Sequence, residues 1–462
     1  MKKKMKIPHT FALLFYFLIV IMVLTYIVPA GNFQRVVDEA SGVETVVPGT
    51  FQFTGEQTPV NPFQLFVCIQ KGFVESGSVI FLIIFAYFCV YTITKTKSLH
   101  AAIGALLKKV GGNDHLLIPI FTVIFALAGS TYGEWDTIYG LIPIFIGVCI
   151  AIGYDAMVGL AVTGMAVGVG FASATTNPFT LGVAQSISDI PMFSGIGLRI
   201  LVFVVFVGIA VWWTMRYAAK IKKNPEASYM KGISMGSLQI DRSELDQAKF
   251  TGKRKFTMCI LLATIVFIVF SSLKLGWYID EMSAIFLFSG LIVSVLWKMK
   301  PDEIVDNFMS SAREILMGAF IVGLSRAILV VLQEGNIIDT IIYALYVPLQ
   351  HLPSWVAAEG MLLLQNIMNL FIPSGSGQAA AVMPLMTPLA DLTGLSRQVA
   401  VLAYQFGDGY SNLFWPTGGI VVMASIAKVP LNKWYKFFAP LFGMMLLLQV
   451  IFIFVAVMIG YQ

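Results

Sequence analysis

Charged side chains are scarce in this chain of 462 residues, because Asp, Glu, Lys and Arg make up only 12% of it and hydrophobic residues make up 58%. A water-soluble domain carries about 25% charged residues, so these proportions exclude a protein whose whole surface faces water. The net charge of +5 does not indicate a nucleic-acid partner, because the basic residues lie between apolar runs. That distribution is typical of the loops that orient a membrane protein.

Cysteine and histidine are also sparse, with four residues of each. No C-x-x-C pair and no H-E-x-x-H motif is present, and we find neither a Ser/His nor a paired-Asp constellation. We therefore predict a protein that is not an enzyme and has no cofactor. The cysteines are far apart and are expected to be free thiols, at positions Cys68, Cys89, Cys149 and Cys259.

Long apolar runs are what the sequence does contain. Runs of about 17 to 22 residues recur along the chain, the length needed to cross a hydrocarbon core of about 30 Å. The first run follows lysines 2, 3, 4 and 6 and lacks an A-x-A cleavage site, so we expect an uncleaved span with a cytoplasmic N-terminus. Basic loops at 220–255 and 428–436 then predict nine spans, an external C-terminus and a multi-pass protein in the bilayer of the bacterial cytoplasmic membrane.

Four apolar stretches are interrupted by polar residues, and the interruptions come in two matching pairs. Each pair has two short arms joined by a polar tip, which we interpret as a re-entrant hairpin, followed by a span broken near its middle. The hairpins are predicted at 115–153 and 355–392, and the broken helices at 155–186 and 396–427, with breaks at 173–178 and 407–412.

The order of these parts predicts an all-α integral membrane protein built from two inverted repeats. The first repeat is expected at 1–217 and the second at 281–462, joined by a cytoplasmic loop at 218–254 and a connecting span at 255–274. Short motifs also match, since Ser130-x-x-Gly133-Glu134 parallels Ser374-x-x-Gly377-Gln378. Discontinuous elements at corresponding places of two repeats indicate the binding site of a transporter.

The interruptions are also the candidate site on physical grounds. Unpaired backbone groups cost several kcal/mol each in hydrocarbon, so breaks persist only against protein or a wet cavity. A break frees N–H groups at one helix end and carbonyls at the other, and these bind anions and cations respectively. The predicted substrate-binding residues are Ser130, Thr131, Glu134, Thr175, Thr176, Asn177, Ser374, Ser376, Gln378, Asp408, Ser411 and Asn412.

Acidic residues are costly to bury at membrane depth. Glu134, Asp136 and Asp408 lie in or beside the interruptions, and they either bind a solute or cap a helix. A cation site for a coupling Na⁺ or H⁺ is expected from Glu134, Asn177, Asp408 and Asn412. Arg326, inside an apolar run, is either a substrate ligand or a structural counter-ion.

Several of these motifs carry a family resemblance. Residues 373–380 (PSGSGQAA) and 399–412 (VAVLAYQFGDGYSN), with 176–179, 183–185 and 195–199, resemble the YfcC-type branch of the C4-dicarboxylate anaerobic carrier family, in the ion transporter superfamily. The resemblance implies a homodimer whose mobile transport domain moves against a scaffold domain, as in an elevator. It also implies solutes that are dicarboxylates or amino acids such as arginine, ornithine and citrulline. The sequence departs from the family at Trp135, where a second acid often follows the first.

We favour an amino-acid symporter or antiporter because the four breaks contain acids but no Lys or Arg. A bare dianion would meet like charge there, at a cost on the order of several kcal/mol, whereas an amino acid brings its own ammonium group. The alternative is a C4-dicarboxylate transporter in which Na⁺ or H⁺ balances the charge. A channel is the alternative of a different class, and it would need a continuous polar pore.

Overall fold

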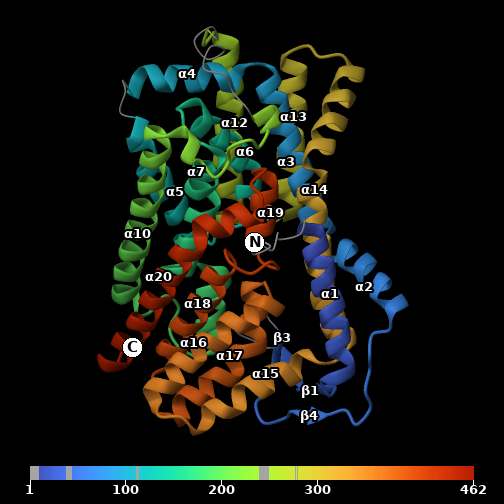
Figure 1. Cartoon of the computed structure of the whole chain (residues 1–462), viewed down its shortest axis with the longest axis vertical. Coiled ribbons are helices and arrows are strands. Elements are labelled where there is room, and N and C mark those ends of the chain that lie inside the picture. Colours follow the sequence, from blue (N-terminus) through green and yellow to red (C-terminus); the bar gives the residue numbers. More distant parts are fainter. Residues whose placement is uncertain (1–9, 38–43, 111–113, 239–248, 276, 278) are drawn as a thin grey trace, which may run out of the picture.

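The computed structural model describes residues 10–37, 44–110, 114–238, 249–275, 277 and 279–462, and it is built almost entirely of helices (Figure 1). The N-terminal lysines and the acidic residues Asp38 and Glu39 lie outside the described residues. Of the described helices, six are long and apolar enough to cross a membrane. They are α1 (Thr10–Ile27), α3 (Gly77–Lys95), α10 (Ile196–Lys223), α13 (Ile279–Leu296), α14 (Pro301–Glu334) and α20 (Leu431–Met458). The chain is therefore a multi-pass membrane protein.

One group of helices, which we call the α14 bundle, has α1, α2 and α14 at the right of Figure 1. Its members are α1, α3, α13 and α14, with α2 (Pro62–Glu75) and α12 (Gly252–Leu275). In it α3 packs against α13 and α14, and α14 also packs against α1 and α2. Glycine allows a close contact here, because a Cβ on Gly72 of α2 would lie 2.6 Å from the Ala327 nitrogen of α14.

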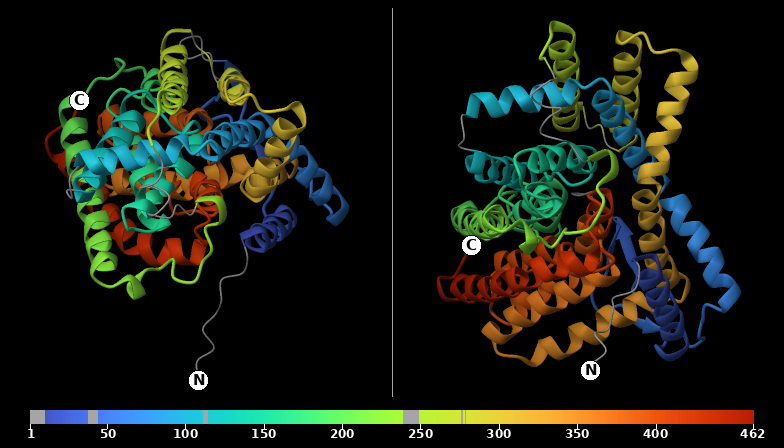
Figure 2. Two further views of the ribbon diagram at one scale, coloured as in Figure 1. Left: turned by 90° about the horizontal axis from the view of Figure 1, so that it is seen from above. Right: turned by 45° about the horizontal axis from the view of Figure 1, so that its top comes forward.

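The second group, the α18 bundle, lies on the other side, so that α2 and α10 are at opposite edges in Figures 1 and 2. It contains α10 and α20, two pairs of shorter helices and two interrupted helices. The pairs are α5 (Leu117–Thr131) with α6 (Ile138–Ala151) and α16 (Ser354–Phe371) with α17 (Gly375–Leu392). The first interrupted helix consists of α7 (Ala156–Leu160), η2 (Ala161–Met165) and α8 (Ala166–Ala172), and after its break it continues as η3 (Pro178–Gly182) and α9 (Val183–Ile187). The second consists of α18 (Arg397–Ser411) and, after its break, α19 (Gly419–Ile426).

Smaller elements cover the two ends of the molecule. Helix α4 (Ser98–Val110) lies across one end, and α15 (Ile338–Tyr346) lies near the other (Figure 1). Strand β1 (Gly31–Asn32) pairs with β4 (Gln52–Phe53), and β2 (Arg35–Val37) pairs with β3 (Glu44–Val46), both antiparallel. The buried Asp339 of α15 anchors this region, because it accepts from Arg35 Nη2 at 2.7 Å and from the Phe33 N–H at 3.0 Å. The remaining short turns are η1 (Asp114–Leu116), η4 (Pro225–Ala227), η5 (Gly236–Leu238) and η6 (Val347–His351).

The second interruption lies later in the chain than the predicted 407–412. Helix α18 continues through Gly407 and Gly409 to Ser411, and the irregular segment is 412–418. The two glycines serve packing instead of breakage, because a Cβ at either one would lie 2.4 Å from a neighbouring helix atom. The break coincides with Trp415-Pro416-Thr417-Gly418, where proline removes a backbone donor.

Candidate functional site

The first tip, residues 132–137 between α5 and α6, is tied to the first break, residues 173–177. The N–H groups of Thr175 and Thr176 donate to the Ser130 carbonyl at 2.9 and 3.2 Å. The Ser130 hydroxyl donates to the Ser173 carbonyl at 2.9 Å, and the Thr131 hydroxyl donates to Leu127 within its own helix at 2.6 Å. These predicted site residues therefore hold the tip and the break together, and their polar groups form hydrogen bonds within the protein.

Asn177 caps the helix that follows the first break. Its Oδ1 accepts from the N–H groups of Phe179 at 2.9 Å and Thr180 at 3.3 Å. The side chain is fully buried, and within the described residues its Nδ2 has no hydrogen-bond partner. Gly133 of the first tip has φ +74° and approaches so closely that a Cβ would lie 2.5 Å from Asn177 Oδ1. Only glycine fits both that conformation and that contact.

Asp408 lies at the centre of a second buried network. Its Oδ1 accepts from Asn369 Nδ2 at 2.9 Å, and its carbonyl accepts from Asn412 Nδ2 at 2.9 Å. Asn369 also donates to Gln378, whose own amide donates to the Gln365 carbonyl at 2.9 Å. The Ser411 hydroxyl donates to the Gly407 carbonyl at 2.6 Å. Among the described residues, Asp408 Oδ2 has no hydrogen-bond partner, although the residue is completely buried.

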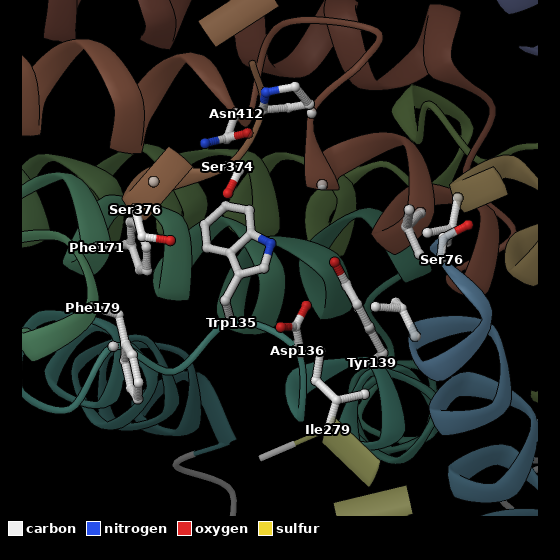
Figure 3. A pocket seen from close by; sticks show the side chains of 18 of the residues that line it. Ser76, Trp135, Asp136, Tyr139, Phe171, Phe179, Ile279, Ser374, Ser376 and Asn412 are labelled. Carbon is white, nitrogen blue, oxygen red and sulfur yellow. The ribbon is translucent and has the colours of Figure 1, made fainter. Parts of the chain in front are cut away.

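A cavity of about 450 Å³ lies between the two bundles (Figure 3). The α18 bundle contributes the first tip, Pro373 to Ser376 at the second tip, and both breaks. The α14 bundle contributes apolar and polar residues from four helices. Those residues are Glu75, Ser76, Val79, Ile279, Met282, Val322, Ser325, Arg326 and Leu329. A polar cavity between two groups of membrane helices is the arrangement that a solute site requires.

Glu134 lines this cavity but serves mainly as a cap. Its carboxylate accepts from the Thr137 hydroxyl, and the backbone N–H groups of Thr137 and Ile138, at the start of α6, stabilise its charge. The Tyr132 hydroxyl also stabilises the charge of this carboxylate. A carboxylate on a helix N-terminus satisfies free N–H groups and complements the helix dipole. The acids were predicted either to bind a solute or to cap a helix, and Glu134 therefore has the second of these roles.

Asp136 and Trp135 differ from Glu134, because they face the cavity. In the described part of the chain we find no hydrogen bond or ion pair of the Asp136 carboxylate, and the side chain is partly exposed. The Trp135 ring lies in the middle of Figure 3, with Ser374 and Asn412 on one side and Asp136 and Tyr139 on the other. It packs edge-on against Phe171, with 5.0 Å between ring centroids. An aromatic ring beside a carboxylate is a suitable surface for an organic cation.

The N-terminus of α17 meets the same cavity. Helix α17 begins at Gly375, and its N-cap residue Ser374 makes no side-chain capping bond. The first-turn N–H groups have no acceptor within the helix, so they are available to an anion. Ser374, Gly375 and Ser376 all line the cavity. The Glu134 carboxylate lies at the start of α6, whereas the start of α17 faces the cavity with Ser374, Gly375 and Ser376.

Arg326 is the basic residue of the cavity wall. Its Nε donates to Glu75 Oε2 at 2.8 Å, and the two side chains are 39% and 38% exposed. The structure therefore gives Arg326 a counter-ion while keeping it next to the cavity. Among the described residues, the cavity lining contains three acids and this one paired arginine, and so its formal charge is negative.

The predicted site residues thus divide into two groups. Those that line the cavity are Glu134, Ser374, Ser376 and Asn412, together with Asp136 and Arg326. Those engaged in hydrogen bonds behind it are Ser130, Thr131, Thr175, Thr176, Asn177, Gln378, Asp408 and Ser411. The sequence reasoning missed the aromatic lining and Thr180, although a tryptophan between two acids in a polar tip was an available signal.

Apolar spanning helices, interrupted helices and a polar cavity between two bundles together define a membrane transporter. More particularly, the chain belongs to the DcuC family, the C4-dicarboxylate anaerobic carriers, whose family model matches residues 7–458.

Two relatives match essentially the whole chain. It is 30% identical to an Escherichia coli K12 protein described as "Putative basic amino acid antiporter YfcC", over 100% of this chain and 98% of that protein. It is 28% identical to an uncharacterized protein of Haemophilus influenzae, over 99% of this chain and 98% of the relative.

Two solved structures are also similar over nearly the full length. The YdaH transporter of Alcanivorax borkumensis is 14% identical, with a TM-score of 0.43 over 98% of this chain and 99% of that one. MtrF of Neisseria gonorrhoeae, described as illuminating a class of antimetabolite efflux pumps, is 15% identical, with a TM-score of 0.43 over 98% of this chain and 96% of that one.

Proposed function

We propose that the protein is a secondary active transporter of small carboxylate-bearing metabolites, and that its preferred solute is an amino acid of the arginine, ornithine or citrulline type. One observation carries this choice. An open helix N-terminus and an unpaired carboxylate line the same cavity, and they suit the two opposite charges of an amino acid.

The α-carboxylate of the solute would bind at the start of α17. There it would meet the free first-turn N–H groups and the hydroxyls of Ser374 and Ser376. No basic side chain is needed for this contact, because the helix end supplies partial positive charge.

The cationic part of the solute would bind at Asp136 and the face of Trp135. Of the three acids predicted to bind a solute or cap a helix, Glu134 lies at the start of α6 and Asp408 lies in a buried network, which leaves Asp136 for the amino group. The proposal is supported by the description of the Escherichia coli relative as a basic amino acid antiporter. Arginine and ornithine would neutralise the excess of acid in the cavity, whereas a dicarboxylate would add to it.

Asp408 is the centre of the coupling-ion site in this proposal. Its Oδ2 lies 3.2 Å from the Cβ position of Gly375, next to Thr180, whose hydroxyl also has no hydrogen-bond partner among the described residues. Oxygen atoms of this kind suit Na⁺, and a proton would suit Asp408 alone. Of the four residues predicted for the cation site, this proposal keeps Asp408 and Asn412. Asn177 bonds instead to the Phe179 N–H, and Glu134 bonds to the Thr137 hydroxyl.

The transport cycle proposed is an elevator movement of the α18 bundle against the α14 bundle. In this proposal the α5–α6 and α16–α17 pairs are re-entrant hairpins, the two halves are inverted repeats, and the protein is a homodimer with a cytoplasmic N-terminus. The position of the cavity between the bundles supports this scheme, because sliding one wall past the other would expose the solute to either side.

The test is uptake of labelled solutes by proteoliposomes containing the purified protein. We expect uptake of arginine or ornithine, with an apparent affinity at least tenfold weaker in Asp136→Asn, and a smaller loss for citrulline. Ser354→Ala, at the far end of α16 from the cavity, is the control and should transport normally. Strong uptake of succinate that arginine and ornithine cannot compete, dependent on Na⁺ or a proton gradient, would contradict the amino-acid proposal.

A dicarboxylate transporter remains the second candidate, and Arg326 is the observation that favours it. If Glu75 turned away, the guanidinium could bind a second carboxylate opposite α17. The same uptake panel separates the two, because Arg326→Gln would then abolish succinate uptake. Single-channel currents in planar bilayers would contradict both and indicate a channel.

A further inference from the structure

Lys428 joins the two bundles on one side of the cavity. It lies in the turn between α19 and α20, and its Nζ is 3.4 Å from Glu314 Oε2 of α14. The same Glu314 oxygen accepts from the Tyr87 hydroxyl of α3 at 3.0 Å. Lys428 Nζ also donates to the Met235 carbonyl at 3.2 Å, in the loop that follows α10. One ammonium group therefore connects the α19–α20 turn to the α14 bundle and to that loop.

The elements that this ion pair connects are also opposite walls of the cavity. Helix α14 lines it with Val322 and Arg326, and α19 lines it with Gly419 and Val422. Glu314 precedes Val322 by two turns, a distance of about 12 Å along the helix. The ion pair is therefore displaced from the cavity toward the side that carries the basic residues 428–436.

Between the cavity and the ion pair, α14 and α19 are in direct contact. The two helices pack on each other there, and a Cβ on Gly318 of α14 would be in ordinary van der Waals contact with Ile426 Cγ1 at 3.4 Å and Ser425 Oγ at 3.5 Å. We call this contact, together with the Lys428–Glu314 pair, the α14–α19 seam. The seam therefore holds the two cavity walls together between the cavity and the ion pair.

We propose that the Lys428–Glu314 ion pair is a gate that holds the α14–α19 seam closed, and that breaking it is the step that opens the cavity to the side of residues 428–436. The two side chains are 27% and 29% exposed, so the attraction between them is partly screened. Such a pair favours the closed state of the cavity over the open state by a small free energy. A gate that opens in every transport cycle requires such a small difference. The inference rests on the proposed transport function, because a gate acts only in a transporter.

The experiment measures accessibility in full-length protein in sealed membrane vesicles of both orientations, without added solute. Val322→Cys places a reporter thiol in the cavity wall, and Cys259→Ala removes the cysteine that is exposed, the other three being buried. A membrane-impermeant maleimide is then applied from each side. We expect Lys428→Met and Glu314→Gln each to raise the labelling rate from the side of residues 428–436 by about twofold to fivefold. Labelling from the opposite side should fall.

The controls separate the ion pair from other effects. Lys436→Met removes an exposed lysine of the same basic segment and should leave both labelling rates unchanged. Glu314→Gln keeps an acceptor for Tyr87, so it tests the charge even where Lys428→Met fails to fold. Exchanging the two charges, Lys428→Glu with Glu314→Lys, should return the rates at least halfway to those of the parent.

Unchanged labelling in both single variants would overturn the gate. A rate raised by Lys428→Met but not by Glu314→Gln would also overturn it, because the effect would then belong to the bond between Lys428 and Met235. Labelling needs no solute, so a failed gate is distinguishable from a failed transport proposal, in which no solute of the uptake panel enters proteoliposomes.

Discussion

Glu134 and Asp136 are two positions apart in the first tip, yet their surroundings assign them different tasks. Glu134 accepts a hydrogen bond from the Thr137 hydroxyl, and the first N–H groups of α6 stabilise its charge, so this charge is used within the protein. Asp136 faces the cavity beside Trp135, without a hydrogen-bonding partner among the described residues. A carboxylate with no internal partner is the one that gains most from a cationic ligand.

Substituting the two acids should therefore produce opposite phenotypes. Glu134→Gln weakens the cap of α6 and should lower the free energy of unfolding by about 1 kcal/mol, with solute affinity changed little. Asp136→Asn should leave stability near that of the parent protein and weaken the affinity for arginine. Thermal unfolding in detergent and uptake in proteoliposomes measure the two effects. Loss of arginine affinity in Glu134→Gln at unchanged stability would reverse the assignment.

The sequence predicted the two tips but could not separate these acids. Polar residues between two short apolar arms are visible without a structure, because hydrocarbon penalises them. Which carboxylate turns back to cap α6 depends on the turn at Gly133, where φ is +74°. Asp408 was found for the same reason as the tips, but its place behind the cavity depends on Asn369, a residue of another helix.

At the scale of the helices, the two interrupted elements meet just before their breaks. A Cβ on Gly409 of α18 would lie 2.4 Å from Ala172 Cα of α8, and Gln405 Nε2 donates to the Phe171 carbonyl at 2.7 Å. This crossing fixes the two breaks relative to each other. It explains why α18 continues through glycines that the sequence suggested as a break, since a glycine in a membrane helix serves either close packing or interruption.

Gly409→Ala should consequently destabilise the protein by about 1–3 kcal/mol, because the added methyl group meets backbone atoms that cannot turn aside. Gly443→Ala is the matched control, since Gly443 lies in α20 with nothing within 4 Å of its Cβ position. Alanine there should be neutral or stabilising by up to about 1 kcal/mol. Thermal unfolding of the two variants side by side tests this, and equal stabilities would mean that the crossing is not tight.

The start of helix α2 is marked in the sequence by capping residues, which hydropathy does not detect. Asn61 and Gln64 form a reciprocal capping box around Pro62 at the first helical position, a pattern that predicts a helix start. Helix α14 likewise begins at Pro301 with Asp302 and Glu303 in its first turn, well before the apolar run that contains Arg326. Charged first turns lie outside any hydropathy window, so capping signals are needed to place such starts.

At the scale of the whole molecule, the cavity depends on both bundles. The α18 bundle supplies the open N-terminus of α17 and the first tip, and the α14 bundle supplies Glu75 and Arg326. Neither wall alone encloses a solute. This division was not visible in the sequence, because the chain passes from one bundle to the other and back, and long-range packing decides which helices pair.

Helix α20 makes a sharp prediction about the two faces of the molecule. Its 28 residues extend over about 42 Å, enough to cross a bilayer, with the basic segment 428–436 at its start. Its far end is anchored, because the Tyr461 hydroxyl donates to the Gly195 carbonyl at 2.6 Å, and the Tyr461 carbonyl accepts from Ser396. The C-terminus should therefore lie on the face opposite Lys428, and outside the cell if the basic segment is cytoplasmic.

A fusion placed after Gln462 keeps Tyr461 in place. With a reporter that is active only in the cytoplasm, we expect no signal from this fusion, and a strong signal when the reporter is inserted at 239–248 between α10 and α12. A strong signal from both positions would mean that α20 does not cross the membrane.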